Sequence, residues 1–127
     1  MEEKPIDKII LDNGLTLELF DHSRPVAGDR WLVSFLARLK VELKREYFKG
    51  PHTPDVSFEE IREAVGDNAH YHHEKTRNFI AETEKDEVFK GLRERFLDAN
   101  LVYLSSPDFP LKLILRQYRE RLRQRTS

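Results

Sequence analysis

The residues best suited to chemistry lie in one short stretch, residues 21–30. It places these polar side chains between two apolar runs: Asp21, His22, Ser23, Arg24, Gly28, Asp29 and Arg30. A guanidinium group is a planar fork that matches a phosphate or a carboxylate, and a glycine lets a ligand approach the backbone. The residue types predict a loop that binds an anion, a nucleotide or a partner, although no fixed phosphate-binding motif accompanies them.

The same stretch also fits a structural role. Asp21 and Asp29 stand where a connection between two strands would begin and end, and Pro25 and Gly28 are ordinary turn residues. Each aspartate could pair with an arginine and fasten the loop. The role of the loop therefore depends on whether Arg24 and Arg30 are both paired or at least one is free.

Histidines form a second group of candidates in the run His-Tyr-His-His-Glu at 70–74. On a strand, His70, His72 and Glu74 would share one face, because successive side chains alternate. Two histidines and a carboxylate suit zinc or ferrous iron, so a metal-dependent enzyme is one hypothesis. On a helix, His70, His73 and Glu74 would cluster instead, so the pattern does not choose a geometry. We expect a solvent-facing strand, with no metal and no cofactor.

Charge is unevenly distributed along the chain, whose net charge is −1. Residues 51–110 hold thirteen acids and seven bases, whereas residues 111–127 hold six bases and the single acid Glu120. A basic terminal helix suits an acidic protein partner, a second copy of the chain or nucleic acid, or it is simply solvated. We expect a protein partner or self-association, because the field of the acidic body opposes nucleic acid.

Alternating apolar residues predict the strands that position these groups. Asn13-Gly14 is a strong hairpin signal, and it joins predicted strands at 7–12 and 15–21. Residues 31–44 carry an apolar side chain at every odd position up to 43, which predicts a long strand paired with 15–21. A helix fits this run only in part, because it would leave Val33 and Val41 on the polar side. A fourth strand is predicted at 69–80.

Helical signals follow mainly in the second half of the chain. Ser57 and Glu60 form a capping box that opens a helix at 58–65, and apolar stripes predict further helices at 84–98 and 110–124. A short edge strand is predicted at 101–104. The order of elements predicts one α+β domain over 1–127, with an antiparallel sheet (7–12, 15–21, 31–44, 69–80) and the three helices packed on one face.

Composition narrows the function classes. The chain has no cysteine, and no apolar stretch approaches the ~20 residues of a membrane helix. No basic and apolar secretory signal opens it, so we expect a soluble, cytoplasmic protein. Asp21, His22 and Ser23 are adjacent and would diverge on a strand end, which disfavours a nucleophilic triad. The first hypothesis is a small non-enzymatic interaction or regulatory protein. The second is an anion- or nucleotide-binding protein that uses 21–30, and the third is the metal enzyme.

Overall fold

The computed structural model describes residues 4–50 and 55–126. Within these ranges five strands form one antiparallel sheet: β1 (Asp7–Ile10), β2 (Thr16–Asp21), β3 (Arg24–Ala27), β4 (Arg30–Glu42) and β5 (Asn68–Ala81). The helices are α1 (Phe58–Val65), α2 (Lys85–Ser105) and α3 (Phe109–Thr126), with short 3₁₀ turns η1 (Arg45–Phe48) and η2 (Glu82–Glu84). The predicted α+β class is confirmed.

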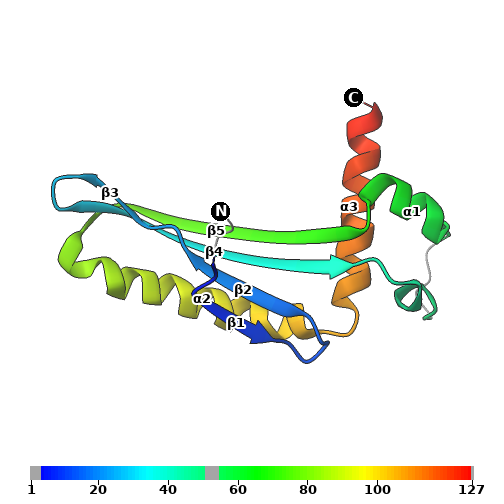
Figure 1. The fold of residues 1–127 in the computed structure, drawn as a ribbon, viewed down its shortest axis with the longest axis horizontal. Helices are drawn as coiled ribbons and strands as arrows, with labels where there is room; N and C mark the ends of the chain where they lie inside the picture. The colour runs from blue at the N-terminus through cyan, green and yellow to red at the C-terminus, as the bar shows by residue number, and fades with distance from the viewer. Residues whose placement is uncertain (1–3, 51–54, 127) are drawn as a thin grey trace.

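The sheet is organised around β4 (Figure 1). On one side β4 pairs with β2 along its second half and with β3 along its first half. On the other side it pairs with β5 over nearly its whole length, and β1 adds to the outer edge of β2. Both β1 and β5 are therefore edge strands.

The strand prediction for 31–44 is confirmed, and the alternation of side chains along β4 explains which of its residues form the core. The odd-numbered residues of β4 turn toward the helices, and Val33, Phe35 and Ala37 are fully buried there. Phe35 packs against Phe89 and Phe96 of α2, with ring centroids 5.9 and 5.4 Å away. A helix could not have buried this whole set, because its period would carry part of it to the solvent side.

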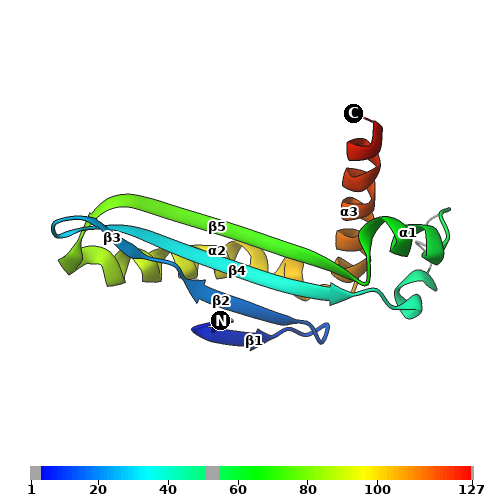
Figure 2. The ribbon, with the colours of Figure 1, turned by 45° about the horizontal axis from the view of Figure 1, so that its top comes forward.

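Helices cover one face of the sheet (Figure 2). The long helix α2 runs along the strands, and the first half of α3 crosses at the end where β5 begins, burying Phe109, Leu113 and Ile114. The short helix α1 packs on α3. Its N-cap is Ser57, whose hydroxyl accepts a hydrogen bond from the Glu60 amide at 3.2 Å, as the capping box predicts.

Two predicted segments differ from the structure. Residues 21–30 are not an open loop, because 24–27 pair with β4 and leave a two-residue turn, Gly28-Asp29. Gly28 has φ +55°, which suits the first position of such a turn. Residues 101–104 are the last turns of α2 rather than an edge strand. Burial overrides their strand propensity, because Leu104 extends the apolar stripe of Leu92 and Phe96.

Asn13 ties the first hairpin to the helices. Its side-chain amide donates to the carbonyls of Leu104 at 2.8 Å and Ser106 at 2.9 Å, at the C-terminal end of α2. Its side-chain oxygen accepts from the Leu15 amide at 3.1 Å within the turn. One half-buried residue therefore fixes the turn and binds both the carbonyl of Leu104, in the last turn of α2, and that of the C-cap residue Ser106.

We predict that Asn13→Asp lowers the free energy of unfolding by about 1–3 kcal/mol, because a carboxylate cannot donate to the two carbonyls it faces. The neighbouring change Asp12→Asn, at an exposed position, should alter stability by less than about 0.5 kcal/mol. Urea denaturation of the two variants measures both. Equal effects would show that the turn sequence matters and the contact with α2 does not.

Candidate functional site

The first three candidate residues, Asp21 to Ser23, hold the bend between β2 and β3. A carboxylate oxygen of Asp21 accepts from the Ser23 amide at 2.9 Å, and the Ser23 hydroxyl accepts from the Ser34 amide at 3.0 Å. The His22 amide donates to the Ser34 carbonyl at 3.0 Å. These groups replace ladder hydrogen bonds where the strand changes direction, so much of their bonding capacity serves the fold.

A small cleft of about 180 Å³ brings Asp21 and Ser23 next to the start of α2. Its only cation in the described chain is Lys85, whose ammonium lies 5.0 Å from the centre of the Trp31 ring and 3.0 Å from a carboxylate oxygen of Asp86. The cleft is smaller than the ~300–1,000 Å³ of ligand pockets, and it holds two acids. This geometry does not favour an anion.

The remaining candidates lie on β3, on the turn that follows it and at the start of β4, and none of them lines that cleft. Arg30 is 3.7 Å from a carboxylate oxygen of Asp29, and its guanidinium carbon lies 5.5 Å from the centre of the Phe79 ring. Arg24 is exposed and forms no ion pair with the described residues. The structure thus pairs one arginine and leaves the other free, but it does not gather all seven candidates into one site.

Phe79 is a feature that the sequence did not reveal. It is 62% exposed and has φ +61°, a conformation that costs a bulky residue energy. With Asn78 it stands opposite the single residue Leu32, because the register between β4 and β5 shifts there. Phe79 is therefore the site of a β-bulge, where an extra residue disrupts the ladder.

Residues 70–74 lie on β5, as the strand interpretation predicts. Glu74 accepts from the Ser34 hydroxyl at 3.2 Å and lies 3.8 Å from the His72 ring nitrogen. Nowhere in residues 4–50 and 55–126 do three or more histidine, cysteine, aspartate or glutamate side chains form a group that could hold a metal ion. The structure therefore gives the metal hypothesis no support.

His73 points to the opposite face of β5, toward α2. Its ring centroid lies 4.7 Å from that of Phe96. Burial lowers the pKa of His73 below its ordinary value of 6.5, and the nearby Lys75 and His72 lower it further. This histidine is part of the packed helix side and differs in surroundings from its neighbours in sequence.

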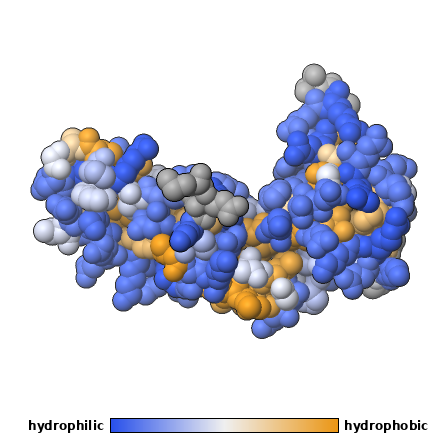
Figure 3. Space-filling view, in the orientation of Figure 1, coloured by the Kyte–Doolittle hydropathy of each residue, from blue (hydrophilic) through white to orange (hydrophobic). Residues whose placement is uncertain are grey.

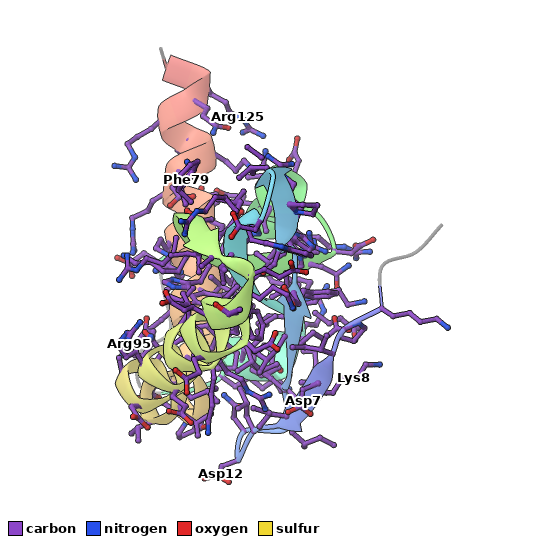
Figure 4. The ribbon with its side chains drawn as sticks, turned by 90° about the vertical axis from the view of Figure 1, so that its left-hand side faces the viewer. Asp7, Lys8, Asp12, Phe79, Arg95 and Arg125 are labelled. Carbon is purple, nitrogen blue, oxygen red and sulfur yellow. The ribbon has the colours of Figure 1, made fainter. Side chains whose placement is uncertain are left out.

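The second half of α3 extends beyond the sheet, and α1 packs beside the helix. At the start of β5 the Gln117 side chain accepts from the His70 amide at 3.1 Å and donates to the His70 carbonyl. Beyond this point α3 protrudes past the edge of β5, and the surface of the protruding segment is mostly hydrophilic (Figure 3). Viewed along the strands, Arg125 stands near its far end, well beyond the sheet and α2 (Figure 4).

Three arginines of this projecting half differ from those arginines of the body that form ion pairs. In the body, Arg45 pairs with Glu59 at 2.7 Å, Arg62 with Asp67 at 2.9 Å and Arg93 with Asp7 at 2.5 Å. Of the described residues, none forms an ion pair with these exposed side chains of α3: Arg119, Arg121 and Arg125. These three charges contribute nothing visible to the fold.

Comparison with known proteins identifies no relative. Neither a family model, nor a curated protein, nor a solved structure matches the chain. The helices in the described part of the chain include none that is long and apolar enough to span a membrane. Conclusions about function therefore depend on the geometry of the molecule itself.

The surroundings of His73 predict a pH dependence of stability. A folded-state pKa below the ordinary value means that the unfolded chain binds the proton more readily, so the free energy of unfolding falls as the pH drops below about 6.5. His73→Gln removes this contribution. Urea denaturation at about pH 7.5 and about pH 5.5 should show a smaller loss for the variant than for the wild type. Equal losses would contradict the assigned cause.

Proposed function

We propose that the protein is a non-enzymatic binding protein that docks on an acidic surface of a partner protein through the projecting half of α3. The unpaired guanidinium groups of Arg119, Arg121 and Arg125 carry this proposal. These side chains are exposed on the half of α3 that extends beyond the sheet (Figure 1), and no acid of the described residues pairs with them, whereas Arg45, Arg62 and Arg93 of the body each pair with an acid.

The charge of the segment supports an anionic partner. Residues 111–127 hold six bases against the single acid Glu120. Cations near the C-terminal end of a helix are favourable to its dipole, but that effect reaches only about the last turn. Arg119 and Arg121 lie more than a turn from the end, so the dipole does not account for them.

An acidic protein surface is favoured over nucleic acid. Residues 51–110 have a net charge of −6, and α1, which carries three glutamates, packs on α3, so a long polyanion would meet repulsion close to the helix. A protein partner can present a local group of carboxylates to the projecting turns without approaching α1. Arginine also suits this role because its planar fork binds a carboxylate through two parallel hydrogen bonds.

The test uses an acidic probe and a neutralised helix. We expect a poly-glutamate peptide of about 20 residues to bind, and its affinity to fall as salt rises from about 50 to about 300 mM. The triple variant Arg119→Gln, Arg121→Gln, Arg125→Gln should weaken binding about tenfold, since each exposed pair contributes about 0.2–1 kcal/mol. Titration calorimetry measures both.

The matched control is Lys85→Gln with Lys90→Gln and Arg24→Gln, which removes three positive charges elsewhere. It should leave the affinity for poly-glutamate within about twofold, because β3 and the first turns of α2, which carry these residues, lie at the end of the sheet opposite α3 (Figure 1). If the two triple variants weaken binding equally, net charge alone explains the attraction, and the proposal is overturned. Tighter binding of a DNA duplex or RNA strand of the same charge would overturn the choice of a protein partner.

A further inference from the structure

We infer that the free edge of β5, from His72 to Arg77, accepts an extended segment of a partner polypeptide as an additional strand, with acidic side chains opposite Lys75 and Arg77. This site is separate from the arginines at the end of α3 and does not depend on their role. The inference rests on the hydrogen-bonding direction of β5, on the charges beside its edge and on the limits of the edge.

The backbone of β5 presents unused hydrogen-bonding groups. His70 directs both its amide and its carbonyl outward, where Gln117 binds them. From residue 68 to 77 the register with β4 is unbroken, so the same outward direction recurs every second residue, at His72, Glu74 and Thr76. In the described chain no group bonds to these outward amides. An edge of this kind is a template for another strand.

The free edge has defined ends. At one end α3 stands across it, with Gln117 occupying His70, and forms an inner corner with β5 (Figure 1). At the other end the bulge at Asn78 and Phe79 shifts the register and interrupts the regular ladder. The usable stretch is thus about six residues, which spans ~20 Å and matches a short peptide strand.

Charges along the edge identify the chemistry of the incoming segment. On the helix side, Lys75 and Arg77 are exposed and have no ion-pair partner among the described residues. Both lie opposite apolar residues of β4, Phe35 and Val33, which cannot neutralise them. Arg116 of α3 adds a third cation, close to Tyr71. Burial raises the pKa of the Tyr71 hydroxyl, and the positive charge of Arg116 opposes this rise.

A strand added to this edge would place every second side chain beside Lys75 and Arg77. Opposite charges on directly opposed residues of neighbouring strands stabilise a sheet, and like charges destabilise it. On the other face Glu74 is already engaged by Ser34 and His72, so that side needs no charged partner. The favoured occupant is therefore an extended segment with acidic residues at alternate positions, bound by strand addition.

The probe is a peptide of about nine residues in which glutamate and valine alternate. We expect it to bind and to slow hydrogen exchange at the amides of His72, Glu74 and Thr76, as measured by NMR. Lys75→Glu with Arg77→Glu should weaken binding at least about tenfold and allow the corresponding lysine–valine peptide to bind. Thr76→Pro should weaken binding to a similar degree, since it removes an outward amide and no ladder hydrogen bond.

Three comparisons separate this inference from simpler attraction. A glutamate–valine peptide methylated at alternate backbone amides keeps its charge but cannot form strand hydrogen bonds, so it should not bind. The control Lys85→Glu with Lys90→Glu makes the same change of charge on α2 and should leave affinity unchanged, as should the triple glutamine variant of α3. Binding of the methylated peptide, or protection of the three amides in the protein alone through self-association, would overturn the inference.

Discussion

Burial of the odd-numbered face of β4 is the interaction on which the rest of the structure depends. Phe35, Ala37 and Val41 are completely buried, and four elements reach them: β2 and β5 as strand neighbours, and α2 and α3 as cover. Side chains alternate between the two faces of a strand, so this set stays buried only if the register of β4 with its neighbours is fixed. A slip of one residue would turn the whole set toward solvent. The pairings of β2, β3 and β5 follow from that single constraint.

The helices cover only one face of the sheet, so apolar side chains on the other face must be shielded from solvent by neighbouring side chains. No helix in the described part of the chain lies over the even-numbered side of β4, yet Leu36 is only 1% exposed and Phe20 only 4%. The guanidinium carbon of Arg38 lies 4.8 Å from the centre of the Phe20 ring, so a long polar side chain shields an apolar one. The polar even positions therefore have a packing role, and their composition alone does not indicate a binding face.

The sequence predicted what depends on period and on local caps. Alternation identified β4 and β2, the Asn-Gly pair identified their neighbour β1, and Ser57 identified the start of α1. It did not predict what depends on contacts between distant segments. The pairing of 24–27 with β4 needs a partner strand that no local pattern reveals, and α2 continues through 101–104 because Leu104 meets the core. The candidate residues of 21–30 were recognised by type, but only the bend at Ser23 and the turn at Gly28 show why they lie apart.

Charges in this molecule divide according to whether the fold uses them. Arg93 holds β1 to α2 through Asp7, and Lys85 rests on Trp31, so both contribute where they lie. No described residue forms an ion pair with Lys75 or Arg77 of β5, or with Arg119, Arg121 and Arg125 of α3, and accumulating such cations costs repulsion. The two groups belong to elements that meet where the side chain of Gln117 binds the backbone of His70. A partner with an acidic surface beside an acidic extended segment could reach both, and its second contact would then form at high effective concentration.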